Sequence, residues 1–270
     1  MFRQPKCPVD TPTRVWIEEA LVWLARQFGD DQFFAHKIVA PNNDTFPVDD
    51  VTGRRSIESI FQSVCALMGV DRAHILLQEI DDAPPLHLVN DDGLAVPTAP
   101  AGLYEEHAQG YTIHISRAEL IDTLGLIGTL SHEVAHFCLR GEGRIEADTL
   151  FCEELLTDLT TVYFGFGVIR AASPREWQSD YSTWPGTDVV RPEYMSIPMY
   201  GYALAVLAWL HDDASPGWSR MVRGDVGKYF KPSLRYLGRT NDSGLHAIRD
   251  CRTLPEKSGP WIHPGLQEHE

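Results

Sequence analysis

The chain has 270 residues, of which 43% are hydrophobic and 23% are charged, and these ordinary globular values exclude a disordered chain. Its formal net charge of −15 excludes sequence-independent binding to nucleic acid, because such binding needs a basic surface that displaces counterions. At this length we expect either one core with an accessory lobe or two modest lobes.

Two capped helices are predicted in the first 70 residues. An amphipathic segment begins at Thr11 and Pro12 and stops at Gly29. A second apolar segment follows Ser56 and stops at Gly69. Serine or threonine before such a segment and glycine after it are typical of helix ends.

Short strands are predicted next. Residues 74–80 and 86–89 are apolar runs separated by a turn sequence. Residues 103–107 and 111–116 flank a second turn, so they predict a hairpin. In the string YTIHIS, which is its second strand, alternate residues face opposite sides of the sheet, with the isoleucines on one side and His114 on the other.

The second half of the chain predicts helices. A capping box from Ser116 to Glu119 predicts a long helix that runs to Arg140 and stops at Gly141. A further helix is predicted over 145–164. Other helical segments are predicted to begin at 173 and to cover 197–211 and 218–238, and residues 241–270 predict a loosely packed tail.

The long helix carries His132, Glu133 and His136 in the string HEVAH. Two histidines four positions apart project from the same face of a helix, so both imidazoles can reach one ion. Glu133 lies beside them and can take a proton from a water on that ion. The pattern therefore predicts a catalytic metal site of the HExxH type.

A third ligand is predicted on the next helix. Glu154 lies eighteen positions after His136, and Asp158 follows Glu154 by one helical turn on the same face. A carboxylate at Glu154 can complete the ligand set, and one at Asp158 can accept the N–H of a ligating histidine.

This combination resembles the gluzincins, zinc metallopeptidases with a thermolysin-like active site, which carry HExxH on one helix and E-x-x-x-D on the next. The resemblance covers about 50 residues, up to the GFG string at 165–167. It implies one Zn²⁺ ion held by His132, His136 and Glu154, with Glu133 as general base and Asp158 as the partner of a zinc-bound histidine. It implies hydrolysis of peptide bonds by a metal-activated water. In such enzymes an edge strand before the first helix often pairs with an extended substrate, and YTIHIS has that place in the sequence.

Further segments, TDL before GFG and the later GYALA, are similar to uncharacterised bacterial zinc metallopeptidases. That similarity extends over most of the chain and implies no particular substrate. It also leaves the oligomeric state and the mode of regulation open.

The order of elements indicates an α+β fold, with a small, mostly antiparallel sheet of about three to five strands packed on the HExxH helix. This is the zincin-like arrangement, followed by a helical C-terminal half. In this interpretation residues 1–100 are an N-terminal segment integrated with the core, and 101–170 are the catalytic core. Residues 171–240 are a helical subdomain, and 241–270 are the tail.

Alternatives for the third ligand remain open in the sequence. Glu142 has the position of the last metzincin histidine, but Leu139 replaces the glycine of that motif. Glu146 is close to His136 in sequence, and Glu153 points about 100° away from Glu154 on a helix. Cys138 and Cys152 lie near the motif, and the favoured interpretation of both is a small core residue.

The oxyanion donor, the metal and the function also have alternatives. A donor for the developing oxyanion is expected among several aromatic residues in the last third of the chain. They are Tyr194, Tyr200, Tyr202, His211 and His246. Manganese, cobalt or iron could replace zinc, since ligand type alone does not choose among them. A non-catalytic or regulatory zinc domain that acts through a protein partner is the alternative function.

The expected location is the cytoplasm. The first sixteen residues lack the apolar core of a signal peptide. The five cysteines are odd in number and scattered, which is typical of reduced thiols. No apolar run approaches the roughly 20 residues needed to cross a bilayer, so we expect no membrane partner.

Overall fold

The computed structural model describes residues 4–34, 38–47, 56–81, 86–89, 95–98, 102–107, 110–145, 153–172 and 183–254. The chain divides into two compact units. One, here called the helical unit, is made of residues 1–37 and 174–270, and the other, the motif unit, is made of 38–173.

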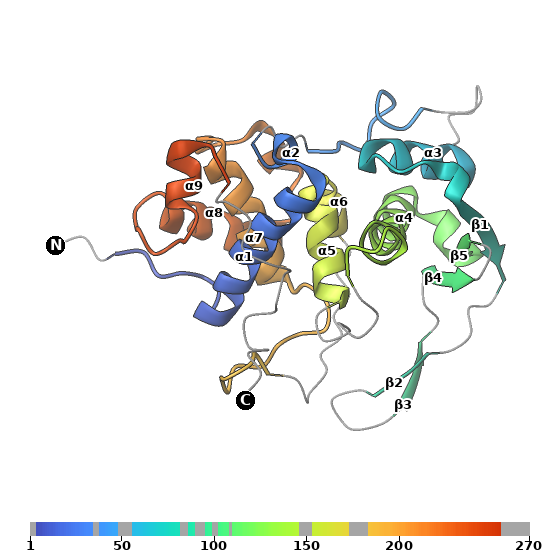
Figure 1. The fold of residues 1–270 in the computed structure, drawn as a ribbon, viewed down its shortest axis with the longest axis horizontal. Coiled ribbons are helices and arrows are strands. Elements are labelled where there is room, and N and C mark those ends of the chain that lie inside the picture. Colours follow the sequence, from blue (N-terminus) through green and yellow to red (C-terminus); the bar gives the residue numbers. More distant parts are fainter. Residues whose placement is uncertain are drawn as a thin grey trace. The chain divides into compact units, whose positions relative to one another are not determined.

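The helical unit is built around α7 (Ile197–Leu210), in which every residue from Met199 onwards is buried. Because α7 is apolar on all sides, it needs neighbours on several faces. It packs against α1 (Thr11–Phe28) and α8 (Gly224–Leu237), as Figure 1 shows. The unit also contains α2 (Asp30–Phe34), the 3-10 helix η5 (Gly217–Met221) and α9 (His246–Cys251).

The expected ends of these helices need two corrections. The cap of α1 is Asp10 rather than Thr11, because the Asp10 carboxylate accepts the N–H of Thr13 at 2.8 Å. The expectation of a loose tail is wrong where α9 forms, since Leu245 is buried at its start. Residues 255–270 of that tail and the helix expected at 173–178 lie outside the described residues.

The motif unit contains a three-stranded sheet in the order β1 (Ile75–Ile80), β5 (Gly110–Ser116), β4 (Gly102–His107). β4 and β5 form the predicted antiparallel hairpin. β1 pairs with β5 in parallel, so the sheet is mixed and not mostly antiparallel as expected. The second predicted strand, β2 (Leu86–Val89), does not join this sheet and pairs instead with β3 (Ala95–Thr98).

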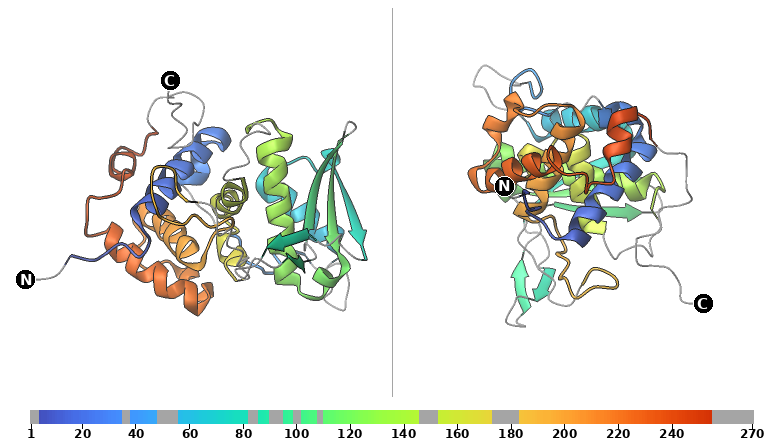
Figure 2. Two further views of the ribbon diagram at one scale, coloured as in Figure 1. Left: turned by 90° about the horizontal axis from the view of Figure 1, so that it is seen from below. Right: turned by 90° about the vertical axis from the view of Figure 1, so that its left-hand side faces the viewer.

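Helices cover one face of this sheet. α3 (Ile57–Met68) has the predicted Ser56 cap and ends at Gly69, whose φ of 71° suits glycine. The HExxH helix, α4 (Thr123–His136), packs on β4 and on α3, and Figure 2 shows it alongside the strands. Short 3-10 helices lie before β1 and after β5, at η1 (Arg72–His74) and η2 (Arg117–Ile121).

The start of α4 differs from the prediction. Ser116 caps only the 3-10 helix η2, and α4 begins after Asp122, whose carboxylate accepts the N–H of Leu124 at 3.0 Å. Glu119 does not complete the capping box, because its carboxylate accepts the hydroxyl of Thr129 at 3.4 Å. The helical path continues beyond α4 as a π-helical turn, η3 (Phe137–Gly141), and ends at the predicted glycine.

The second predicted helix is described from residue 153 onwards. α5 (Glu153–Tyr163) ends just before Gly165, the predicted stop, whose φ is 94°. Residue 145 lies in a bend rather than in a helix, and 146–152 lie outside the described residues. A short helix, α6 (Gly167–Arg170), follows and packs on both α4 and α5.

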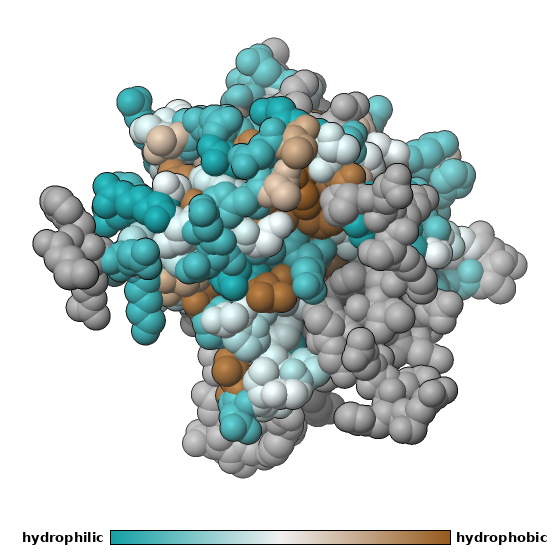
Figure 3. Space-filling model, turned by 60° about the vertical axis from the view of Figure 1, so that its left-hand side comes forward, coloured by the Kyte–Doolittle hydropathy of each residue, from teal (hydrophilic) through white to brown (hydrophobic). Residues whose placement is uncertain are grey.

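One face of the molecule is shown in Figure 3. Its described residues are mostly hydrophilic, with separate hydrophobic spots. None of the helices within the described ranges has the length and hydropathy needed to span a membrane.

Candidate metal centre

The two histidines of the motif lie on the buried part of α4. His132 is 1% exposed and His136 is 7% exposed, and apolar residues of the same helix, such as Leu130 and Val134, are fully buried. The two rings are 4.9 Å apart between centroids and nearly perpendicular. Both imidazoles therefore reach the same point beside the helix, as their spacing of four predicts.

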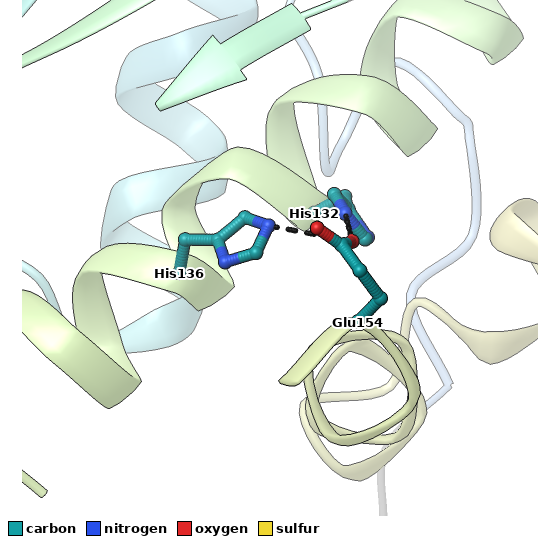
Figure 4. A group of neighbouring side chains, drawn as sticks. All are labelled: His132, His136 and Glu154. Atoms are coloured by element: carbon teal, nitrogen blue, oxygen red, sulfur yellow. Dashed lines mark hydrogen bonds and ion pairs between the residues drawn. The ribbon is translucent and has the colours of Figure 1, made fainter. Parts of the chain in front are cut away.

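α5 brings Glu154 to that point from the facing helix. Its Oε2 lies 3.0 Å from Nε2 of His132 and 3.6 Å from Nε2 of His136. Figure 4 shows the carboxylate between the two rings. One ligand atom from each of the three residues lies within 4.8 Å of the others, so the group could hold a metal ion.

Asp158 holds the other nitrogen of His132. Its Oδ1 lies 2.9 Å from Nδ1 of His132, and Asp158 has no exposed surface. Nε of Arg170 donates to the same oxygen at 3.1 Å, and Arg170 is itself 4% exposed. α6 delivers this arginine close to α4, where Gly128 lies near the Arg170 side chain. The buried ion pair orients the ring so that Nε2 faces Glu154.

His136 is oriented by a different pair of groups. Its Nδ1 lies 3.3 Å from Oε1 of Glu153 and 3.3 Å from the hydroxyl oxygen of Thr157. Thr157 donates its own proton to the carbonyl of Glu153 at 2.8 Å, so its oxygen is left to accept from His136. Both imidazoles thus donate from Nδ1 and direct Nε2 towards Glu154.

The cluster attracts positive charge. Burial disfavours the charged form of His136, but hydrogen bonds to Glu153 and Glu154 outweigh burial and raise its pKa to about 10. Burial would raise the pKa of Glu154, yet hydrogen bonds from His132 and His136 hold this pKa far below its usual value. The pKa of Glu153 is likewise lowered, because its contacts with His136 and Arg140 outweigh its burial. A site that stabilises imidazolium so strongly is also suited to a cation.

The donor set fits a zinc ion better than a hard cation. Two imidazole nitrogens and one carboxylate oxygen are preferred zinc ligands, whereas Ca²⁺ and Mg²⁺ prefer sites built from oxygen alone. The partners at Asp158, Glu153 and Thr157 supply the hydrogen bonds that ligating histidines usually make.

Glu133 lies against the first residue of β4. A Cβ on Gly102 would lie 2.8 Å from both Cγ and Oε1 of Glu133, and 2.9 Å from the methyl carbon of Thr129. The backbone of β4 can approach this carboxylate only because Gly102 has no side chain. Glu133 is 3% exposed, and Gly102 is among the residues packed against it.

The expectation that YTIHIS is an edge strand is wrong. These residues form β5, which is the central strand and pairs with β1 on one side and β4 on the other. β4 is an outer strand of this sheet, and it is the strand that begins beside Glu133. His114 pairs with Glu105 at 2.8 Å on the opposite face of the sheet from Ile113.

The rival ligands have other positions. Glu142 pairs with Arg144 and does not belong to the three-residue group. Glu153 is hydrogen-bonded beside the group, as its helix angle predicts, and contacts Arg140. Glu146 lies outside the described residues.

Of the two cysteines near the motif, Cys138 is among the described residues, and it belongs to the core. Cys138 is 1% exposed, and burial raises the pKa of its thiol to about 12. A buried thiol with such a pKa stays protonated near neutral pH. Cys152 lies outside the described residues.

All five candidates for the oxyanion donor belong to the helical unit. The hydroxyl of Tyr202 donates to Glu18 at 2.6 Å, and Tyr202 has no exposed surface, so this residue is part of the core. Tyr200 is also fully buried. His211 contacts the carbonyl of Phe33, His246 packs on Trp209, and Tyr194 is half-buried.

Four residues around the site do not follow from any sequence pattern. Gly102 faces Glu133, Arg170 pairs with Asp158, and Arg140 pairs with Glu153. The ring of Tyr104 stacks on His136, with 5.9 Å between centroids and 14° between planes. Only Arg140 is close to the HExxH motif in sequence, and nothing in the sequence distinguishes the four residues from their neighbours.

Comparison of the chain with protein-family models, with the curated proteins and with the solved structures found no match. Any function therefore has to be inferred from the side chains of the site.

Proposed function

We propose that this protein is a zinc-dependent metallopeptidase that hydrolyses peptide bonds, with Glu133 as general base. The observation that carries the proposal is the approach of Glu154 to the Nε2 atoms of His132 and His136, with Glu133 next to one of those histidines in the chain. This is the residue set that a metal-assisted hydrolase requires. The α+β architecture of the motif unit is compatible with a zincin-like fold, which is part of the proposal.

Each side chain has a defined role in this mechanism. When bound, a zinc ion lowers the pKa of a water and polarises a carbonyl. Glu133 accepts the proton of the attacking water and returns it to the leaving amine. Asp158 and Glu153 keep the imidazoles in one tautomer. Direct attack by water requires no acyl-enzyme.

β4 is the strand that we propose to pair with substrate, in place of the YTIHIS strand. An extended peptide added along its outer edge would have its backbone held by hydrogen bonds of the sheet type. Because β4 begins at Gly102, such a peptide would pass close to Glu133.

A purely structural zinc site is less well supported. Structural sites usually have four protein ligands, often cysteines. Within the described part of the chain the ligand group has three members and no cysteine. Three ligands leave a coordination position for water or substrate, which catalysis needs.

The substitution Glu133→Gln tests the base. We expect the variant to bind zinc with the parent's stoichiometry and to lose hydrolysis of any peptide that the parent cleaves, because the amide cannot accept the proton. Zinc content is measured by elemental analysis, and cleavage by comparative proteomics of cells that express parent or variant. Equal cleavage by both proteins would exclude Glu133 as the base.

Glu154→Ala tests the ligand set with a different readout. We expect a sharp loss of zinc affinity in chelator competition, because one of three ligands is removed. Glu142→Ala is the matched control, since Glu142 follows His136 by six positions without joining the group, and it should keep the parent's affinity. Stoichiometric zinc in Glu154→Ala would show that the ion binds elsewhere.

A further inference from the structure

We propose that Arg140 is a positioning residue that sets the metal affinity of the site by holding Glu153 against His136. The inference rests on the proposed metal site and adds a determinant that the HExxH and E-x-x-x-D motifs do not contain. It concerns binding of the ion, so it can be tested without a substrate.

Arg140 connects three elements of the motif unit. It lies on the π-helical turn η3, four residues after His136. Its Nε donates to Oε1 of Glu106 on β4 at 3.0 Å, and its Nη1 donates to Oε1 and Oε2 of Glu153 on α5 at 3.3 and 3.4 Å. Oε1 of Glu153 in turn lies 3.3 Å from Nδ1 of His136. A continuous chain of charged contacts therefore runs from the outer strand of the sheet to a candidate ligand.

Glu153 is a carboxylate held by two partners, His136 and Arg140, which together outweigh the effect of burial and lower its pKa. Of these two, only Arg140 carries a permanent positive charge, because an imidazole that binds a metal ion is neutral. The side chain of Glu153 is only 10% exposed, so water screens its contact with the guanidinium poorly. Without the guanidinium, Glu153 would turn outwards to solvent, and Nδ1 of His136 would keep only its 3.3 Å contact with Thr157.

His132 has a parallel arrangement, with Arg170 on Asp158 and Asp158 on Nδ1. The pair of Arg170 and Asp158 is buried, so removal of Arg170 would leave a buried carboxylate without this arginine and threaten folding. Arg140 has 28% of its side chain exposed, so its pair with Glu153 can be tested in a folded protein.

The sign of the effect distinguishes positioning from simple electrostatics. Arg140 is a cation beside a cation site, so removal of its charge alone should strengthen metal binding. Removal of a positioning residue should weaken it, because outer partners of ligating histidines typically contribute about 10- to 100-fold to affinity.

The experiment measures the Zn²⁺ affinity of the full chain by competition with a chromophoric chelator. We expect Arg140→Gln to bind Zn²⁺ about tenfold more weakly than the parent, and Glu153→Gln to show a similar loss. The double variant should be no weaker than either single variant, because both substitutions break the same chain of contacts. The absorption spectrum of the Co²⁺-loaded protein should change in Arg140→Gln, since it reports the orientation of His136.

Arg144→Gln is the matched control. Arg144 is a partly exposed arginine just after the same turn, and it contacts Glu142 and the carbonyl of Cys138 instead of Glu153. We expect this variant to bind Zn²⁺ at least as tightly as the parent. Arg140→Lys keeps the charge, but one ammonium group cannot reproduce the two-nitrogen bridge, so an intermediate loss is expected.

Zn²⁺ affinity in Arg140→Gln equal to or higher than that in Arg144→Gln would overturn the proposal. If Arg140→Gln does not fold, the same judgement applies to Arg140→Lys, for which parent-like affinity would be the overturning result. Glu154→Ala, measured in parallel, distinguishes failure of the positioning role from failure of the metal site. If Glu154→Ala loses Zn²⁺ binding while Arg140→Gln keeps the parent's affinity, only the role of Arg140 is refuted. If Glu154→Ala binds Zn²⁺ as the parent does, the metal site itself is refuted.

Discussion

Gly102 links the candidate base to the sheet. A Cβ on residue 102 would lie 2.8 Å from Cγ and Oε1 of Glu133 and 2.9 Å from the methyl carbon of Thr129. The carboxylate is the flexible end of its side chain, so it would have to move if a Cβ were added. The three atoms nearest to such a Cβ belong to Glu133 and Thr129, and none of them belongs to the two histidines or to Glu154.

Gly102→Ala should therefore separate metal binding from catalysis. We expect parent-like Zn²⁺ affinity together with a fall of about 100-fold in kcat/KM on a substrate that the parent cleaves, because a base displaced by about 1 Å loses its alignment. Chelator competition and a peptide cleavage assay measure the two quantities. Gly227→Ala, where an added Cβ meets nothing within 4 Å, is the control and should keep both. Full activity in Gly102→Ala would refute the alignment of Glu133 by β4.

At the scale of single residues, the sequence predicts the groups that repeat with the helical period. His132 and His136 share a face because they are four apart, and Asp158 follows Glu154 by the same interval. Arg140 and Arg170 escape such prediction, because their acidic partners come from other elements and a lone arginine is usually solvated.

At the scale of elements, α7 and α8 are packed unusually closely at Gly201. A Cβ there would lie 2.6 Å from Cβ of Tyr229 and 3.0 Å from two backbone atoms, the nitrogen of Phe230 and the carbonyl oxygen of Val226. Backbone atoms of a helix cannot yield individually, so the two helices would have to separate along their contact.

Gly201→Ala should accordingly destabilise the helical unit by about 1–3 kcal/mol, even though alanine is the better helix former. The free energy of unfolding from urea titration followed by tryptophan emission measures this loss. Gly227→Ala lies on the facing helix α8 with open space around it and should be neutral or slightly stabilising. A stabilised Gly201→Ala would contradict the close packing.

Element ends were predicted well where the signal is local. Ser56 and Gly69 bound α3, and Gly165 follows α5, because a hydroxyl cap and a positive φ act within a few residues. The start of α4 was predicted wrongly, because Glu119 bonds to Thr129, a partner that the capping-box pattern does not consider.

At the scale of the whole molecule, the described tryptophans and the candidate metal centre belong to different units. The described tryptophans belong to the helical unit, and the candidate ligands belong to the motif unit. These tryptophans are Trp16, Trp23, Trp184, Trp209 and Trp218, and the two others, at 177 and 261, lie outside the described residues. Tryptophan emission therefore reports on one unit, and hydrogen exchange in α4 and α5 reports on the other.

Zinc should stabilise the motif unit selectively. At a free concentration 100 times Kd, binding contributes about 2.7 kcal/mol to the state that binds the ion. We expect slower amide exchange in 123–136 and 153–163, with little change in the thermal midpoint followed by tryptophan emission. Removal of the ion with a chelator should reverse the exchange effect. An equal rise of both stabilities would mean that the two units unfold as one.

The sequence alone determined that His132 and His136 share one helix face beside Glu133, and it determined the ends of helices such as α3 and α7, because helical spacing and capping depend on neighbours within about one or two turns. Among the carboxylates that the sequence leaves as candidates for the third ligand, the tertiary structure brings Glu154 to the two histidines. The tertiary structure decided that β4, rather than β5, is the outer strand beside the motif and that Gly102 meets Glu133. It also decided which arginine holds which carboxylate. These features join residues from different elements, and such pairings arise from packing and burial, which no short stretch of sequence records.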